Sequence, residues 1–135
     1  MKNYIAYHGE SIMGYPFKSP TDGWCNFLSN KKLWHLDTVV GNKVWIISSS
    51  RMGSTLNTYF FRGYFVPSRV KEWNKDGYEF WIGGQEYFLA AKPICLNDEH
   101  WFQEFVKSQG SFRFGINEIK QANFVAELEN LQAGC

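Results

Sequence analysis

Cysteine and histidine are scarce in this sequence. The three cysteines are odd in number and far apart, at Cys25, Cys95 and Cys135. The histidines are equally scattered, at His8, His35 and His100. No Cys-x-x-Cys pair and no His-x-x-x-His or Glu-x-x-His spacing gathers metal ligands or redox partners on one element. We therefore expect free thiols, no bound metal and no cofactor.

Long apolar runs are missing as well. No stretch approaches the roughly 20 residues that a helix needs to cross a bilayer, and the N-terminal MKNYIAYHGES lacks the apolar core of a signal peptide. A nucleophile elbow, a glycine-rich phosphate loop and internal repeats are absent too. The sequence thus predicts a cytoplasmic protein without a membrane partner, which binds a ligand rather than catalysing a reaction.

Aromatic residues, in contrast, are abundant, at 19%, and hydrophobic residues together make up 44%. With 135 residues, the chain has the length of one ordinary domain and can bury a core. We expect a single domain over residues 1–135. The segment Leu131-Gln132-Ala133-Gly134-Cys135 has the form of a helix exit, which leaves open that this domain is the N-terminal part of a longer protein.

Charge is divided unevenly along the chain, although the net charge is only +1. Residues 1–75 carry ten Lys and Arg against four Asp and Glu, whereas residues 76–135 carry four against nine. Such a division is typical of a protein with a basic face that binds a polyanion and an acidic, solvated flank. Chance clustering of solvated charges is the alternative, so the asymmetry favours nucleic-acid binding without deciding it.

Several short segments have the character of β-strands. Three apolar runs are bounded by turn residues: Tyr4–Tyr7, Val44–Ser48 and Tyr59–Val66. The last two are separated by a turn at Gly53–Thr58, and Gly63 within a strand indicates a bulge or a close backbone approach. The Gly/Pro/Ser-rich segment Gly9–Gly23 has the composition of an ordered loop, and loops of this length are usually functional.

A tight hairpin is predicted at Gly83-Gly84. The runs Tyr78–Ile82 and Gln85–Leu89 flank this pair, and two glycines between apolar runs indicate a two-residue turn, because both positions can adopt positive φ.

The C-terminal third is predicted to be helical. Asn97 or Asp98 is expected to cap a helix that ends near Gly110, and Asn117 a final helix that ends near Gly134. A short strand over Ser111–Phe114 is expected between them. The fold class is therefore α+β: a strongly curved, barrel-like mixed sheet flanked by helices, two of them C-terminal.

Functional residues are expected first in the block Gly23–Leu33, which places an indole, small polar groups and cations close together. The strand that follows ends in three serines, Ser48 to Ser50. Holding one extruded nucleobase beside a phosphate backbone requires this combination of groups. The alternative is that Trp24 is a core ring, the serines an ordinary strand end and Lys31-Lys32 a solvated pair.

Three segments resemble the core of the PUA-like superfamily: Trp24–Leu33, the strand Val44–Ser50 and the return strand Tyr59–Val66. Trp24-Cys25-Asn26 followed by Asn30-Lys31-Lys32-Leu33 is similar in order and spacing to one wall of the methylated-base pocket of YTH domains. The segment Gly41–Ser48 resembles the Gly-Asp-x-x-Phe-Tyr-His-Ser strand of EVE domains and departs from it at the Asp and His positions. The resemblance covers about the middle half of the chain and implies a PUA-like barrel.

The resemblance also implies a function, the reading of a modified base that is flipped into an aromatic pocket. Some bacterial proteins join an EVE-like reader to an HNH nuclease. By analogy we expect 5-methyl- or 5-hydroxymethylcytosine in double-stranded DNA, a modification-dependent restriction system and a nuclease in a separate, C-terminal domain. Three alternatives remain open: a YTH- or ASCH-like binder of modified RNA, a small nucleic-acid-processing enzyme that uses Cys25 and His35, and a binder of a small ligand or a peptide.

The residues that would carry this function fall into two groups. Base contacts are expected from Trp24, Cys25, Asn26, Ser48, Ser49 and Tyr59. Phosphate contacts are expected from Lys31, Lys32, Ser50, Arg51, Arg62 and Arg69. One stacked ring contributes about 1–3 kcal/mol per base, whereas unstacking costs a few kcal/mol. A second aromatic wall is therefore required beside Trp24, and the candidates are Tyr59, Trp34 and Trp73.

Overall fold

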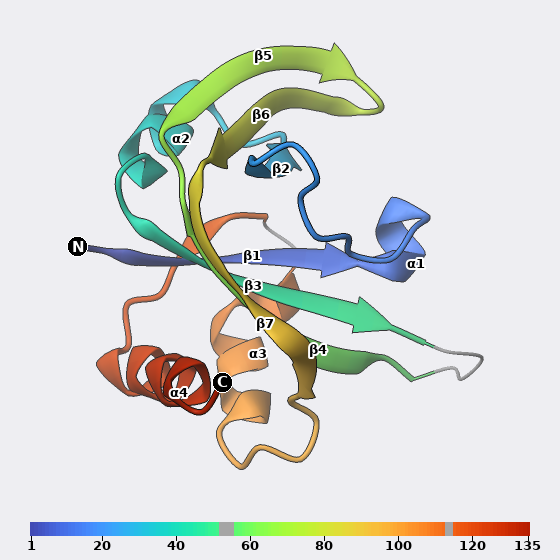
Figure 1. The fold of residues 1–135 in the computed structure, drawn as a ribbon, viewed down its shortest axis with the longest axis vertical. Coiled ribbons are helices and arrows are strands. Elements are labelled where there is room, and N and C mark those ends of the chain that lie inside the picture. The colour runs from blue at the N-terminus through green and yellow to red at the C-terminus, as the bar shows by residue number, and fades with distance from the viewer. Residues whose placement is uncertain (52–55, 113–114) are drawn as a thin grey trace.

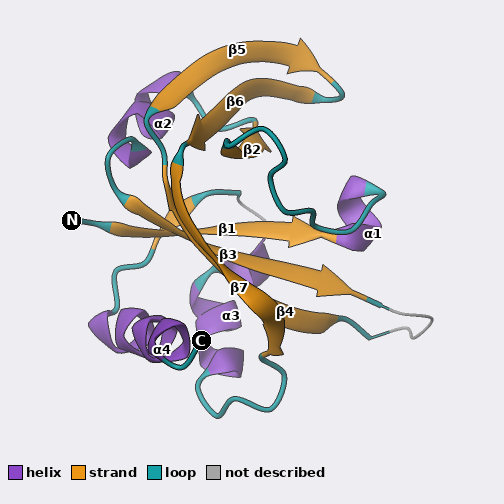
Figure 2. Ribbon diagram, viewed as in Figure 1, coloured by secondary structure: helices purple, strands orange, loops and turns teal. Residues whose placement is uncertain are grey.

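The computed structural model describes residues 1–51, 56–112 and 115–135 and has a mixed α+β fold (Figures 1 and 2). The strands are β1 (Asn3–Gly9), β2 (Cys25–Ser29), β3 (Lys43–Ser50), β4 (Thr58–Val66), β5 (Arg69–Lys75), β6 (Tyr78–Gly84), β7 (Glu86–Cys95) and β8 (Asn117–Glu118). The helices are α1 (Glu10–Met13), α2 (Leu33–Val39), α3 (Phe102–Ser108) and α4 (Ala122–Ala133), with a 3-10 turn η1 at Gly110–Phe112. The α+β class is thus confirmed, with two C-terminal helices.

The strands form two sheets. The larger has five strands in the order β7-β4-β3-β1-β8, in which β1 and β3 are parallel and the other pairs antiparallel. The smaller is antiparallel and has three strands in the order β2-β6-β5. Within the described residues these sheets do not close into a barrel, so the barrel-like arrangement expected from the sequence is not reached.

Strand β3 separates two hydrophobic clusters because successive side chains point to opposite faces of the sheet. Trp45 and Ile47 face α3 and α4 in one cluster. Val44 and Ile46 face α2 and the small sheet in the other. Figure 1 shows α3 and α4 below the large sheet and α2 with the small sheet above it. This continuous burial explains why Val44–Ser48 reads as an uninterrupted apolar run.

The prediction of a hairpin at Gly83-Gly84 is wrong. Strand β6 pairs with β5, and β7 pairs with β4, so β4–β5 and β6–β7 make one long ribbon that belongs to both sheets. The turn of this ribbon is Asp76-Gly77, where both residues have positive φ, 59° and 83°, as a type I′ turn requires. The two glycines lie instead where the ribbon passes from one sheet to the other (Figure 1).

A close backbone crossing requires the glycines at that point. A Cβ added to Gly84 would lie 2.1 Å from the carbonyl oxygen of Val66, and one on Gly83 would lie 2.6 Å from the indole of Trp81. The amide of Ser68 donates a hydrogen bond of 2.9 Å to the carbonyl oxygen of Gly83. A larger residue at Gly84 would push the two arms of the ribbon apart where the sheets meet, whereas one at Gly83 would displace the indole of Trp81.

The other N-terminal predictions are close to the structure. Strands β1, β3 and β4 contain the three predicted runs, and Gly63 lies at a register shift, where an added Cβ would be 2.0 Å from the carbonyl oxygen of Phe88. The predicted loop Gly9–Gly23 contains the one-turn helix α1. Of the predicted turn Gly53–Thr58, residues 53–55 lie outside the described residues.

The C-terminal helices begin later than predicted. Neither Asn97 nor Asp98 caps α3, whose N-cap is Trp101 with no side-chain cap hydrogen bond. The side-chain oxygen of Asn97 instead accepts a hydrogen bond of 2.7 Å from the amide of Tyr59 and so ties the loop to β4. Asn117 lies in β8, which pairs with β1, and α4 begins only at Ala122. The predicted strand at Ser111–Phe114 is wrong for Ser111 and Phe112, which belong to η1, and residues 113–114 lie outside the described part. No described helix has the length and apolarity to span a membrane.

Candidate aromatic cleft

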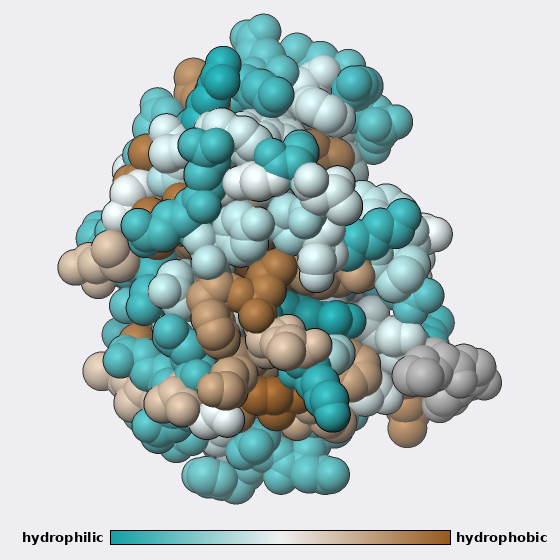
Figure 3. All heavy atoms as spheres, viewed as in Figure 1, coloured by the Kyte–Doolittle hydropathy of each residue, from teal (hydrophilic) through white to brown (hydrophobic). Residues whose placement is uncertain are grey.

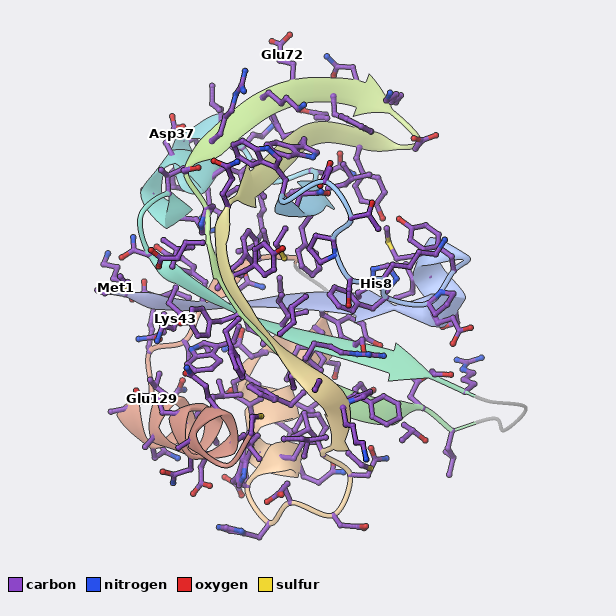
Figure 4. The ribbon with its side chains drawn as sticks, viewed as in Figure 1. Met1, His8, Asp37, Lys43, Glu72 and Glu129 are labelled. Atoms are coloured by element: carbon purple, nitrogen blue, oxygen red, sulfur yellow. The ribbon has the colours of Figure 1, made fainter. Side chains whose placement is uncertain are left out.

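A cleft of about 710 Å³ opens at the C-terminal end of β1. Its walls come from β1, from α1 and the loop after it, from β2 and from the β5–β6 turn, all of which Figure 1 places on the same side of the molecule. The lining residues that carry the argument are His8, Tyr15, Phe17, Asn26, Trp73 and Tyr78. In Figure 4, His8 marks the position of this cleft at the end of β1.

One wall of the cleft is a series of aromatic rings. The imidazole of His8 has its centroid 5.1 Å from the ring of Tyr15 and 5.9 Å from that of Phe17. Phe17 stacks on Phe27 at 6.5 Å, and Phe27 stacks on Phe65 in the core at 5.8 Å. These ring contacts run from the core outward and join the loop after α1 to the sheet.

The β5–β6 hairpin supplies rings from a different element. Trp73 and Tyr78 line the cleft, and the hydroxyl of Tyr78 donates to the sulfur of Met13 at 3.1 Å, which joins this hairpin to α1. The ammonium of Lys75 lies 4.1 Å from the ring centroid of Trp73. The indole Nε1 of Trp73 is buried without a hydrogen-bond partner among the described residues. Rings thus enter the cleft from two independent elements.

Polar groups enter from β2, which is an edge strand of the small sheet. Asn26 is exposed and is one of the residues that line the cleft. Asn30 is already occupied, because its side chain bonds the carbonyl of Gly77 at 2.8 Å and the amide of Glu79 at 2.9 Å. Asn26 is therefore the amide side chain with the freedom to contact a ligand, whereas Asn30 positions the hairpin turn.

His8 is neutral at ordinary pH. Burial has the largest effect and lowers the pKa of its imidazole, while the hydrogen bond to Tyr15 raises it by less. The charge of Arg62 lowers this pKa further and that of Glu10 raises it, both by smaller amounts. Nε2 donates a hydrogen bond of 2.8 Å to the carbonyl oxygen of Tyr15, because a carbonyl only accepts. The neutral ring then keeps Nδ1 as an acceptor.

This lowered pKa makes stability depend on pH. Above the unfolded value of about 6.5, His8 is neutral in both states and its contribution to stability is fully present. As the pH falls through the lower pKa of the folded state, protonation favours the unfolded chain. We expect the free energy of unfolding in urea to decrease more steeply below about pH 6.5 in the wild type than in His8→Gln, whose amide keeps the bond to Tyr15. Equal slopes would contradict this assignment.

Of the base contacts predicted from sequence, only Asn26 lines the cleft. Trp24 is half-buried outside it, with its ring 5.7 Å from that of Trp81. Cys25 is 2% exposed, and burial raises the pKa of its thiol to about 12. The block around Trp24 thus contributes one amide to the cleft, because strand alternation turns Cys25 into the core while Trp24 precedes the strand.

The serines and Tyr59 are occupied elsewhere. The hydroxyl of Ser48 accepts a hydrogen bond of 2.7 Å from Nε of Arg62, and that of Ser49 bonds the hydroxyl of Tyr7. The ring of Tyr59 packs 5.2 Å from that of Phe102, on the face of the sheet covered by α3. These three residues therefore build the core and the support of the cleft rather than its surface.

The predicted phosphate contacts are dispersed. Lys31 lines the cleft. Arg62 is half-buried behind it, 5.3 Å from the ring centroid of Phe17, and burial lowers the pKa of its guanidinium. The remaining four lie away from the cleft: Lys32 at the N-cap of α2, Ser50 and Arg51 at the end of β3, and Arg69 at the start of β5. Of the six predicted phosphate contacts, Lys31 thus lies at the cleft and Arg62 directly behind it.

The predicted second wall has one candidate in the cleft, Trp73. Trp34 is 71% exposed on α2, and Tyr59 is half-buried against the core on the face of the sheet covered by α3. Sequence reasoning missed His8, Tyr15, Phe17 and Tyr78 as lining residues. The signal for Tyr15 and Phe17 was the long Gly/Pro/Ser-rich loop that carries them, whereas nothing in the sequence distinguishes Tyr78 from a core residue.

The burial of Cys25 gives a direct test of the core around the cleft. Since its thiol is shielded and has a pKa of about 12, it carries almost no thiolate at neutral pH. Cys95 and Cys135 are exposed. We expect a water-soluble maleimide to label these two thiols rapidly in the native protein and Cys25 only after denaturation. Mass spectrometry of the labelled peptides provides the measurement, and rapid labelling of Cys25 would contradict its burial.

A second hollow differs in character from the aromatic cleft. It has about 520 Å³, lies between the N-terminus of β1 and α4, and is lined by no aromatic ring. Its charged lining includes Glu118 and Glu129 as well as Lys2 and Lys120. Within the described residues no group of three or more His, Cys, Asp and Glu could hold a metal ion. The aromatic cleft is therefore the candidate functional site.

Comparison with known proteins adds no relative to these observations: no family model, no curated protein and no solved structure matches the chain at a significant level.

Proposed function

We propose that this domain binds nucleic acid that carries a modified base and holds that base, turned out of the strand, in the aromatic cleft. The observation that carries the proposal is the lining of the cleft, where rings from the loop after α1 and from β5–β6 meet the exposed amide of Asn26. Its volume of about 710 Å³ is within the range of small-molecule sites and accommodates a nucleotide.

The free-energy cost of flipping a base favours a cleft with an aromatic ring on each side of that base. Unstacking and unpairing a base costs a few kcal/mol, and each aromatic contact returns about 1–3 kcal/mol. Tyr15 or Phe17 on one side and Trp73 on the other would together offset this cost. An amide both donates and accepts, so Asn26 suits the edge of a base, and Lys31 supplies a cation for the adjoining phosphate.

The preferred ligand in this proposal is 5-methyl- or 5-hydroxymethylcytosine in double-stranded DNA, and the proposed context is a modification-dependent restriction system. This choice rests on the resemblance to EVE and YTH domains. The basic balance of residues 1–75, which contribute most of the cleft, supports a polyanionic partner.

Two features weigh against the enzyme alternative with Cys25 and His35. A thiol with a pKa of about 12 is a poor nucleophile at neutral pH. The Nε2 atom of His35 is bonded to the carbonyl oxygen of Ile116 at 2.8 Å, which leaves this nitrogen protonated and unable to act as a base. A binding role is therefore preferred.

The deciding experiment is a competition titration with short duplexes that differ in one base: cytosine, 5-methylcytosine, 5-hydroxymethylcytosine or N6-methyladenine, each also as RNA. We expect the tightest binding for DNA with a modified cytosine. Preference for methylated RNA would favour the YTH-like alternative. Equal affinity for all of them would refute base reading.

The amide of Asn26 gives a sharper version of this test. Asn26→Ala is expected to reduce the preference for the modified duplex about tenfold, since a good hydrogen bond to a base edge is worth about 1–3 kcal/mol. Binding of the unmodified duplex should change little. Asn42→Ala is the control, because Asn42 is an asparagine just before β3 that does not line the cleft. Its side chain donates to the carbonyl of Thr38 at 2.9 Å and accepts from the amide of Lys2 at 2.8 Å. A loss of preference in both variants would contradict the role of Asn26.

A further inference from the structure

Indole rings and lysines alternate across the small sheet, in a series that we call the tryptophan–lysine row. Its members are Trp24, Trp81, Lys71, Trp73 and Lys75. The rings of Trp24 and Trp81 are 5.7 Å apart, and the ammonium of Lys71 lies 4.4 Å from the ring centroid of Trp81 and 6.0 Å from that of Trp73. The ammonium of Lys75 lies 4.1 Å from Trp73. The contacts are thus continuous from Trp24 to the cleft-lining Trp73.

The row begins on the sheet face that points away from the core. Val70 and Ile82 pack into the hydrophobic cluster beneath the small sheet. Their chain neighbours Lys71 and Trp81 are directly paired across β5 and β6, so strand alternation directs both of them to the opposite face. Lys71 and Lys75 are exposed, and Figure 3 shows hydrophilic side chains over the part of the molecule that β5 occupies.

The chemistry of the row suits a polyanion. Contact with an indole ring stabilises a lysine ammonium by about 0.5–1 kcal/mol at an exposed site. Because the ring has no net charge, the contact restricts the position of the ammonium but leaves its positive charge available to a ligand. Arg69 adds a third exposed cation on β5. The ammoniums of Lys71 and Lys75 lie 6.0 and 4.1 Å from the same ring centroid of Trp73, so they are no more than about 10 Å apart, a length over which a DNA strand advances by about three nucleotides. A row of ordered charges at this spacing matches a phosphate backbone.

We propose that the tryptophan–lysine row binds the sugar-phosphate backbone of the strand that leads away from the cleft. This proposal rests on the proposed function for the position of the strand, since Trp73 belongs to both the row and the cleft. In this arrangement Trp24 does not contact the flipped base. It supports Trp81 and the lysine above it.

The test compares the double variant Lys71→Gln/Lys75→Gln with two controls, Lys43→Gln and Lys2→Gln/Lys43→Gln. The affinity of each is measured for a duplex that carries one 5-methylcytosine and for the same duplex without the modification. Lys43 is a matched control, because its ammonium also lies over rings, 5.1 Å from Trp45 and 4.4 Å from Tyr64, but Figure 4 places it far from His8. The double variant should bind both duplexes about tenfold more weakly at low salt and should lower the slope of log affinity against log salt by roughly 1.8. Lys43→Gln, alone or with Lys2→Gln to match the charge change, should alter neither.

The outcomes separate the row from the cleft. A slope that is unchanged in the double variant, or equally reduced in the Lys2→Gln/Lys43→Gln control, would overturn the proposal. So would a selective loss of preference for the modified duplex, because the lysines would then act through the Trp73 wall. If the wild type binds both duplexes equally and the row variant still weakens both, base reading fails while backbone binding by the row is supported.

Discussion

Replacing Gly84 with alanine is expected to lower the free energy of unfolding by about 3 kcal/mol. The added Cβ would lie 2.1 Å from the carbonyl oxygen of Val66 and 3.0 Å from the Cα of Pro67. Both are backbone atoms in the other arm of the ribbon, so no side-chain rotation relieves the contact. The arms must separate where the two sheets meet. Urea denaturation followed by tryptophan fluorescence measures the loss.

Gly134→Ala is the matched control for this change. Gly134 follows α4, has an ordinary negative φ of −83°, and an added Cβ would meet its nearest neighbours at 3.7 Å, an ordinary van der Waals distance. We expect its stability to change by no more than about 1 kcal/mol. A loss below about 1 kcal/mol for Gly84→Ala would contradict the crossing described at this position.

The same crossing explains which part of the fold was predictable. Val44–Ser48 and Tyr59–Val66 are apolar runs rich in β-branched and aromatic residues and bounded by turn residues, a local signal that does not depend on which strands are neighbours, and both are strands. Gly83-Gly84 was ambiguous because a glycine pair meets two needs, a turn with positive φ or a close approach of two backbones. The choice depends on which strands pair, and that is decided by contacts far apart in the sequence. The local signal for the real turn was Asp76-Gly77.

The candidate site was less predictable than the fold. The block Trp24-Cys25-Asn26 is next to the cleft, but β2 pairing turns Cys25 inward and leaves Asn26 alone on the lining. Ser48 and Arg62 are joined by a hydrogen bond although they were expected to contact a base and a phosphate. Polar residues at a strand end can form hydrogen bonds with a ligand or with a neighbouring side chain, and only the packing of the folded chain decides between these two roles. Composition predicted a site with aromatic and polar residues, but not which of these residues line the cleft.

The paired walls of the cleft give the largest functional effect that we expect. Tyr15→Ala and Trp73→Ala should each weaken binding of the modified duplex about tenfold to a hundredfold, since under the proposed function each removes one ring that would stack on the base at about 1–3 kcal/mol. Affinity for the unmodified duplex should change by less. Trp34→Ala is the control, because its ring is 71% exposed on α2 and does not line the cleft.

The double variant distinguishes a clamp on one base from two separate contacts. If both rings enclose the same base, loss of one already makes flipping unfavourable, because the remaining ring no longer offsets the unstacking cost. Tyr15→Ala/Trp73→Ala should then be little weaker than the worse single variant, with a coupling energy above about 1 kcal/mol. Additive losses would mean that the rings act on different parts of the ligand. Thermal melts of all variants establish that each one remains folded, because a clamp requires both walls in place before the base arrives.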